Sequence, residues 1–222
     1  VPRPWEIIAI TFTNKAAGEL KDRLAARLGP MANDVWASTF HSACVRILRR
    51  DIDRLGFAKD FTIYDTDDSL RVVKDVVKEL NLDDKTFQPK SVLSVISAAK
   101  DRYLGPEEFA QKHSAETDWR MGRIAKIYAA YQKKLASASA LDFDDIIFHT
   151  VTLLKQEPEV LACYQKKFRY VCVDEYQDTN HLQYLLTGLL AGGRRNLCVV
   201  GDDDQSIYRF RGANIENILN FE

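Results

Sequence analysis

The chain has 222 residues, 46% of them hydrophobic, which is enough to bury a core in one large domain or in one domain with an insertion. Its formal net charge of −1 excludes overall basicity as a source of nucleic-acid binding, so any such binding must come from a local surface. No apolar run approaches the roughly 18 residues of a membrane helix, and the first residues lack the layout of a secretory signal, so we expect a cytoplasmic protein that binds no membrane.

The first residue is Val1 rather than methionine, and it stands directly before a strand-like segment, so we expect a fragment of a longer protein. Four cysteines lie at wide and irregular spacings, which are Cys44, Cys163, Cys172 and Cys198. Two of them lie inside apolar strand-like runs. This pattern favours reduced thiols in the core over disulfides or a zinc site.

Two strand-to-helix units open the chain. The apolar run at residues 7–10 is followed by alanines and leucines at helical spacing as far as Leu28. The run at residues 35–38 is followed by a second helical pattern that ends near Gly56. Two such units in succession predict a parallel sheet with helices on its faces.

The segment from residue 57 to residue 139 reads as helices only. Residues 65–68 supply a cap and an acidic first turn, Pro89 and Pro106 each open a further helix, and a long helix covers about residues 119–135. Strand-like runs then return before Asp174 and before Gly201. We therefore expect one α/β domain interrupted by an all-helical inserted subdomain, with the parts at residues 1–56, 57–139 and 140–222.

Polar clusters follow all four predicted strands. They are Thr11–Asn14, Ser38–His41, Asp174–Asp178 and Gly201–Gln205. In open parallel sheets, ligands bind beyond the carboxyl ends of the strands, where loops and helix N-termini converge. The four clusters are therefore the first candidates for a functional site.

Asp174 and Glu175 end an apolar strand with two adjacent carboxylates. This pattern suits a site where one carboxylate faces a phosphate-bound Mg²⁺ and the next faces the water that attacks phosphorus. An apolar strand can also end in a solvated Asp-Glu pair of no special function, and this short motif by itself leaves both interpretations open.

Gln205 follows the next predicted strand, and its amide could orient water or sense a γ-phosphate. Residues 206–212 then alternate aromatic and basic side chains, as in contacts to single-stranded nucleic acid. Taken alone, Tyr208 and Phe210 fit ordinary core packing better than a nucleic-acid contact.

Two charged groups have structural interpretations. Arg46, Arg49, Arg50 and Arg54 alternate with acidic residues and fit a solvated helix face better than a DNA track. Asp142, Asp144 and Asp145 are predicted to include a helix cap rather than a metal cluster.

Five segments resemble, in order, the motifs of superfamily 1 DNA helicases of the UvrD/Rep/PcrA type, with the PcrA branch closest. They are residues 11–17 (TFTNKAA), 38–41 (STFH), 141–145 (LDFDD), 173–179 (VDEYQDT) and 200–213 (VGDDDQSIYRFRGA). Each motif alone is weak, but five in order are specific. The resemblance implies a RecA-like parallel sheet with helices on both faces, interrupted by the helical insertion.

The resemblance also implies roles in an ATP-dependent reaction. Asp174 would help to hold Mg²⁺ and ATP, Glu175 would be the general base, and Gln205 would report the γ-phosphate to the DNA side. The residues implied to contact single-stranded DNA are Phe12, Thr13, Asn14, Thr39, His41, Phe143, Tyr208, Phe210 and Arg211. Many relatives carry Trp at the position of Phe210; Phe keeps a stacking face but lacks the indole N–H.

The phosphate loop Gly-x-x-x-x-Gly-Lys-[Ser/Thr] is not found, because no glycine of the chain is followed by lysine. The resemblance implies that the parent protein is an ATP-dependent 3′–5′ DNA helicase acting on single strands and single-strand/duplex junctions. Because the phosphate loop is missing from these residues, we expect the chain alone to be inactive. One alternative is a non-catalytic module that binds single-stranded DNA or a protein. A helicase joined to a nuclease is another that these residues cannot separate from the first.

Overall fold

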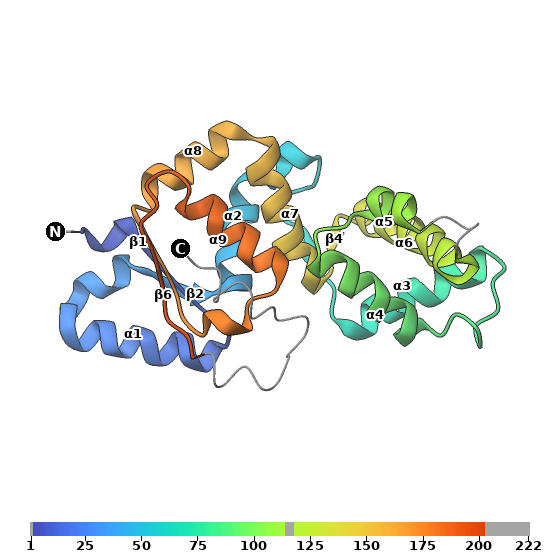
Figure 1. Ribbon diagram of the computed structural model, residues 1–222, viewed down its shortest axis with the longest axis horizontal. Helices are drawn as coiled ribbons and strands as arrows, with labels where there is room; N and C mark the ends of the chain where they lie inside the picture. Colours follow the sequence, from blue (N-terminus) through green and yellow to red (C-terminus); the bar gives the residue numbers. More distant parts are fainter. Residues whose placement is uncertain (1, 114–117, 203–222) are drawn as a thin grey trace.

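The computed structural model describes residues 2–113 and 118–202, which form a sheet domain and a helical subdomain beside it (Figure 1). The four strands of the main sheet are all parallel and stand in the order β2-β1-β5-β6. Their bounds are Ile7–Thr11 for β1, Trp36–Thr39 for β2, Tyr170–Val173 for β5 and Leu197–Val199 for β6. The predicted α/β class is confirmed.

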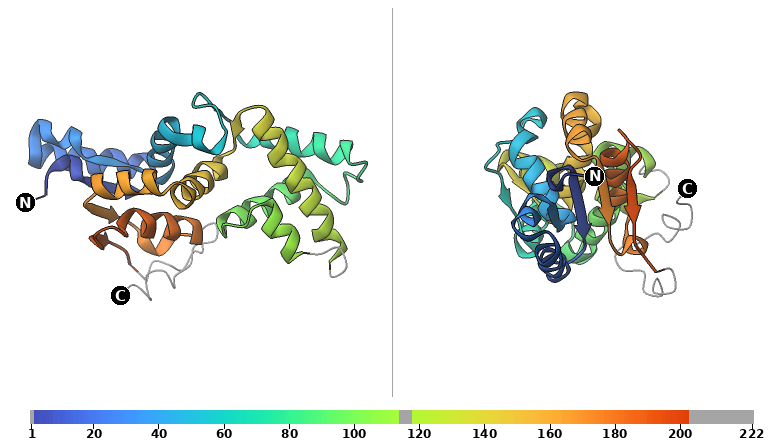
Figure 2. Two further views of the ribbon diagram at one scale, coloured as in Figure 1. Left: turned by 90° about the horizontal axis from the view of Figure 1, so that it is seen from above. Right: turned by 90° about the vertical axis from the view of Figure 1, so that its left-hand side faces the viewer.

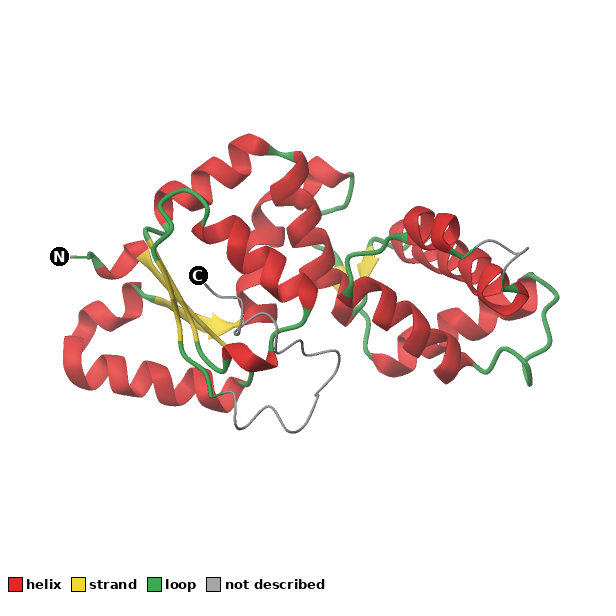
Figure 3. Cartoon of the chain, viewed as in Figure 1, coloured by secondary structure: helices red, strands yellow, loops and turns green. Residues whose placement is uncertain are grey.

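Helices cover both faces of this sheet, as predicted (Figure 3). Helix α1 (Asn14–Leu28) packs on one face, where it contacts β1 and β2. The other face packs Ile8, Ile10, Val171 and Val173 into the main hydrophobic core. The helices that supply the rest of that core are α2 (Phe40–Asp51), α7 (Phe143–Gln156), α8 (Pro158–Lys167) and α9 (His181–Ala191).

The inserted helical part lies beside the sheet domain, as the left view of Figure 2 shows. It has a core of its own, which includes Val76, Ile96 and Tyr128. Asp65 caps its first helix in a capping box with Asp68, which is the predicted start. Its helices are α3 (Thr66–Glu79), α4 (Pro89–Asp101), α5 (Pro106–Lys112) and α6 (Trp119–Ser137). A separate core lets this part keep its shape while it meets the sheet domain over a limited contact.

The segment 57–139 is not helical only, which corrects the sequence prediction. Strand β3 (Thr62–Ile63) lies within it and pairs in parallel with β4 (Ala140–Leu141). Two-residue strands carry too little hydrophobic periodicity to be found from sequence. This pair connects the segment that leads into the helical insertion with the segment that leads out of it.

The described residues also include short 3-10 helices. They are η1 (Pro4–Glu6), η2 (Gly29–Asp34), η3 (Ile52–Leu55) and η4 (Tyr176–Asp178). Within these residues, no helix combines the length and the apolar character needed to cross a bilayer.

The four cysteines carry free thiols, but they are not all core residues. Cys44 is fully buried, whereas Cys172 is half-buried and Cys198 is exposed. The expectation of a core position is wrong for both Cys163 and Cys198, which are exposed. Cys163 lies on α8, and Cys198 lies on β6 at the edge of the described sheet.

Candidate active site

The carboxyl ends of all four strands of the main sheet meet at one edge. Thr11 at the end of β1 is the register partner of Thr39 at the end of β2, and Val173 of β5 is the partner of Val199 of β6. The sheet order also places a topological switch point between β1 and β5, because the chain leaves β1 toward one side and β5 toward the other. Ligands of open α/β sheets bind at such a point.

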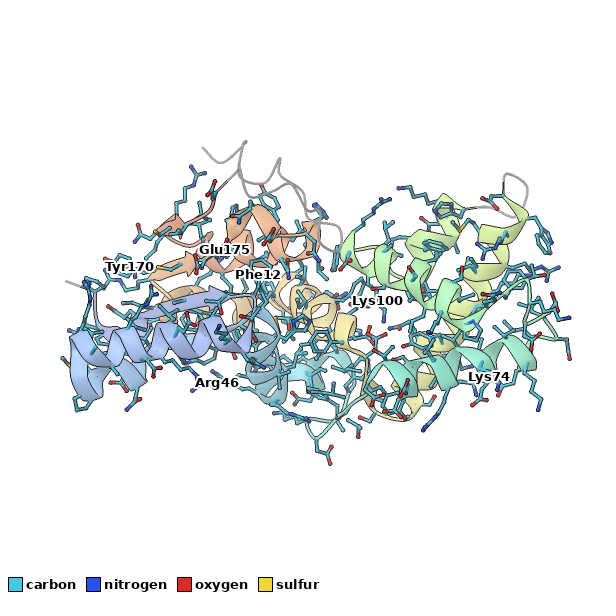
Figure 4. All side chains as sticks on the ribbon, turned by 90° about the horizontal axis from the view of Figure 1, so that it is seen from below. Phe12, Arg46, Lys74, Lys100, Tyr170 and Glu175 are labelled. Atoms are coloured by element: carbon cyan, nitrogen blue, oxygen red, sulfur yellow. The ribbon has the colours of Figure 1, made fainter. Side chains whose placement is uncertain are left out.

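Asp174 and Glu175 directly follow β5 at this switch point. In Figure 4, Glu175 lies near Phe12, which follows β1. The Asp174 backbone N–H donates to the Ile10 carbonyl at 3.0 Å, which fixes the end of β5 against β1. Both carboxylate side chains are exposed, and no described Lys or Arg forms an ion pair with either. The edge therefore presents two carboxylates, whose oxygens are hard ligands that could bind a divalent cation.

Glu175 has a left-handed backbone, with φ 52° and ψ 43°. For a residue other than glycine, this left-handed backbone conformation costs on the order of 1–3 kcal/mol, and such strained residues are common at functional sites. Asp174 Oδ1 accepts a hydrogen bond from the Glu175 N–H at 3.0 Å, which helps to hold the turn.

Gln177 ties Glu175 to the neighbouring strand end. Its side chain is buried, with 2% of the residue exposed, and its Nε2 donates to Glu175 Oε2 at 2.6 Å. Its Oε1 accepts from the Asp202 N–H at 3.1 Å, just beyond β6. Gln177 is not among the site residues predicted from sequence, although its place two residues after Glu175 within the same polar cluster was a signal.

The negative charge of Glu175 affects the pKa of a neighbouring carboxyl group. Burial raises the pKa of Asp178, and the charge on Glu175 raises it further. Among the described residues, no cluster of three or more His, Cys, Asp or Glu side chains could hold a metal. Magnesium needs only one or two protein carboxylates, since phosphate and water supply its other ligands, so the exposed Asp174 fits such an ion.

An aromatic surface lies beside the acidic edge. The ring of Phe143, at the start of α7, stacks on the ring of His41, in the first turn of α2, with centroids 3.8 Å apart and planes 19° apart. Phe143 is 52% exposed. Phe12 is half-buried and meets Phe40 edge-on at 5.3 Å. The fold thus brings together two of the predicted DNA contacts from distant segments.

Two of the remaining described candidates, Thr13 and Thr39, cap helices, and Asn14 is the first residue of α1. Thr13 Oγ1 accepts from the Ala16 N–H at 3.1 Å at the start of α1, and Thr39 Oγ1 accepts from the Ser42 N–H at 3.2 Å at the start of α2. Thr13 and its neighbour Asn14 are exposed. Thr39 is 7% exposed, so its hydroxyl serves the helix cap in this structure.

Four candidates fall outside the described residues, and their roles stay predictions. They are Gln205, Tyr208, Phe210 and Arg211.

Comparison with known proteins decides the family. The model of the UvrD/REP helicase N-terminal domain matches residues 2–222. The chain belongs to this family. Its fold and its five ordered motifs agree with that membership.

Several family members with assigned names are similar to this chain over nearly its whole length. A protein of Bacillus subtilis named ATP-dependent DNA helicase PcrA is 57% identical over 219 residues, which are 99% of this chain and 29% of that protein. Proteins of the same name from Staphylococcus aureus and Staphylococcus epidermidis are each 52% identical over 99% of this chain and 30% of their own length. This UvrD/REP family chain thus spans less than a third of the relatives it matches.

Proposed function

We propose that this chain forms most of the first motor domain of an ATP-dependent DNA helicase. The observation that carries the proposal is the pair Asp174 and Glu175 at the switch point of a parallel sheet, with Glu175 hydrogen-bonded to the buried Gln177. The relatives named ATP-dependent DNA helicase support the same conclusion. The proposed compartment of such a protein is the cytoplasm.

The carboxylates have separate tasks in this proposal. Asp174 would hold the Mg²⁺ ion of bound ATP, and that ion supplies charge neutralisation at the phosphates. Glu175 accepts the proton of the attacking water, since its carboxylate is exposed at the strand end. Gln177 orients Glu175 through the 2.6 Å hydrogen bond. Gln205 is the proposed contact to the γ-phosphate.

Single-stranded DNA is the proposed polymer substrate, at single-strand/duplex junctions and with 3′–5′ polarity. The exposed face of the Phe143 ring, backed by His41, offers a platform on which an unstacked base can lie. Phe12 follows β1 and Glu175 follows the neighbouring strand β5, so base contacts and phosphate chemistry would share one edge of the sheet (Figure 4).

The 222 residues by themselves lack a phosphate loop, because none of their 10 glycines is followed by lysine. Backbone N–H groups and a lysine are needed to bind the phosphates. We propose that these residues alone do not hydrolyse ATP, and that they do so when joined to the segments that supply the phosphate loop and the second motor domain.

A chimeric protein tests this proposal. The chain replaces the matching 219 residues of the Bacillus subtilis relative, and the relative itself is the control. We expect the chimera to hydrolyse ATP with stimulation by single-stranded DNA and to unwind a duplex with a 3′ single-stranded tail. A folded chimera without ATP hydrolysis would contradict the proposal.

A second candidate function is a non-catalytic module that binds single-stranded DNA or a protein. The exposed Phe143 ring favours it, because a base or an apolar side chain could pack there without any nucleotide chemistry. The same chimera distinguishes the two: salt-dependent DNA binding without ATP hydrolysis would support the binding module instead of the helicase.

A further inference from the structure

A buried ion cluster lies where the inserted helical part meets the sheet domain (Figure 4). Lys100, near the end of α4, is fully buried, and its Nζ lies 2.6 Å from Asp142 Oδ2 and 2.8 Å from Asp145 Oδ1. Burial opposes the charged ammonium, but the two carboxylates outweigh it and hold the pKa of Lys100 well above its usual value. Lys100 is therefore charged at neutral pH, and it crosses from the insertion to the start of α7.

Two side chains of α6 contact the same carboxylates. Tyr131 Oη donates to Asp142 Oδ2 at 2.8 Å, and Gln132 Nε2 donates to Asp145 Oδ1 at 3.0 Å. Both donors belong to the inserted part, and both acceptors belong to the sheet domain. Two helices of the insertion, α4 and α6, therefore bind the start of α7.

Asp142 and Asp145 also form the capping box of α7. Asp142 Oδ1 accepts from the Asp145 N–H at 2.8 Å, and Asp145 Oδ2 accepts from the Asp142 N–H at 3.2 Å. Each carboxylate therefore uses one oxygen for the helix cap and the other for the insertion. Phe143 is the next residue after Asp142, so the cap sets the backbone from which its ring projects toward His41.

A second contact shows that the end of α4 is fixed to the sheet domain at more than one point. Asp101 Oδ1 accepts from Asn180 Nδ2 at 2.8 Å, and Asn180 is the N-cap of α9. If stability alone were at stake, apolar side chains could serve as well as buried ions, because desolvation offsets much of their attraction. A charged cluster with directional bonds sets geometry as well.

We propose that Lys100 is a positioning residue for the surface formed by His41 and Phe143. Through Lys100, the inserted part holds the cap of α7 and so keeps the Phe143 ring stacked on His41, ready to receive an unstacked base. The inference rests on the proposed function in one respect, which is that this surface contacts single-stranded DNA. The geometric part requires no ligand.

The first test is proton NMR of the 222-residue chain without DNA. A stacked Phe143 ring shifts the ring protons of His41 upfield, and Phe143→Leu gives their position without the stack. Lys100→Met removes the ammonium at similar length. Tyr131→Phe removes only the hydroxyl that donates to Asp142, so it tests the same cluster without leaving an uncompensated charge.

Two control variants lose matched groups of the insertion whose printed bonds go to partners outside the cluster. Lys134→Met breaks an exposed ion pair with Glu79, and Tyr128→Phe loses a hydrogen bond to the Leu104 carbonyl. We expect the His41 protons to move toward their position in Phe143→Leu in both cluster variants, with the larger shift in the lysine variant, and to stay in place in both controls.

Unchanged His41 shifts in both folded cluster variants would overturn the inference. If Lys100→Met does not fold, the tyrosine variant decides by the same criterion. A shift of equal size in the control variants would also overturn it, because the effect would then be general loosening of the insertion.

The second test is titration of the chain with a single-stranded oligonucleotide at several salt concentrations. Loss of one stacked base weakens binding at least about fivefold, so Lys100→Met is expected to show this loss and Lys134→Met is not. Equal affinity of folded Lys100→Met and wild type would overturn the inference for DNA. Absence of binding by the wild type would instead contradict the proposed DNA contact, and the NMR result would still decide the role of Lys100.

Discussion

Gln177 shows what a single residue adds to the candidate site. Its buried amide accepts from the Asp202 N–H and donates to Glu175, so it joins the ends of β5 and β6. The carboxylates could be selected from sequence because two acidic residues ended an apolar run. The role of Gln177 could not, because only the 3-10 turn of residues 176–178 directs its side chain back toward Glu175.

Replacing Gln177 by Met should lower catalysis more than binding. The variant keeps similar length but lacks both hydrogen bonds, so Glu175 is no longer held, and misplacement of a catalytic group by about 1 Å can cost about 10²-fold in rate. In the chimera, we expect kcat for ATP to fall by about this factor with KM little changed.

Gln165→Met is the matched control for this experiment. It loses one amide-donated hydrogen bond, to the Leu189 carbonyl, away from the strand ends. Steady-state ATP hydrolysis measures both variants. Equal kcat in the two would mean that Gln177 has no positioning role.

Helix α7 is the element on which several functions meet. It begins at the predicted Asp142 cap, presents Phe143 to solvent and carries the half-buried His149. His149 packs against Phe57 with centroids 4.9 Å apart. Its buried Nε2 has no hydrogen-bond partner among the described residues and lies 3.7 Å from Asp145 Oδ1. Burial lowers the pKa of His149, although the Asp145 carboxylate opposes the shift. The ring is therefore neutral in the folded protein at neutral pH.

His149 should make the fold sensitive to mild acid. Its pKa is about 6.5 in the unfolded chain and lower in the folded one, so below about pH 6.5 the unfolded state binds more protons. The stability that the neutral ring contributes is present above that pH and is lost as the pH falls through the folded pKa. Urea unfolding of wild type and His149→Phe from pH 7.5 to 5 measures the difference.

The variant should lose less stability than wild type over this range. Asp142 titrates in both proteins, since burial raises its pKa to about 6, and its effect has the opposite sign. The difference between the two proteins therefore isolates His149. Parallel curves of unfolding free energy against pH would contradict the prediction.

At the scale of the whole molecule, the parallel sheet and the helical insertion follow from local patterns. Apolar runs of four residues, caps such as Asp65 and prolines at helix starts are all written in short stretches of sequence. The β3–β4 pair and the cluster around Lys100 are not, because their members are far apart along the chain. A lysine between Ala99 and Asp101 gives no sign that it will be fully buried.

The candidate site divides in the same way. It was predictable that residues at the strand ends would form the candidate site, since parallel strands bring their carboxyl ends to one edge of the sheet. The stacking of His41 on Phe143 was not, because it depends on how α2 and α7 pack. The predicted subdomain boundaries at residues 56/57 and 139/140 stay predictions, as do the roles of residues 203–222.

The central claim is that Glu175 is the base of an ATP-hydrolysis site, and Glu175→Gln in the chimera tests it most directly. The amide keeps the size of the side chain but accepts no proton, so we expect kcat to fall by about 10²–10⁴-fold while nucleotide affinity is kept. Glu159→Gln, on the exposed start of α8, is the control and should hydrolyse ATP like the chimera without a substitution. Full ATP hydrolysis by Glu175→Gln would contradict the account.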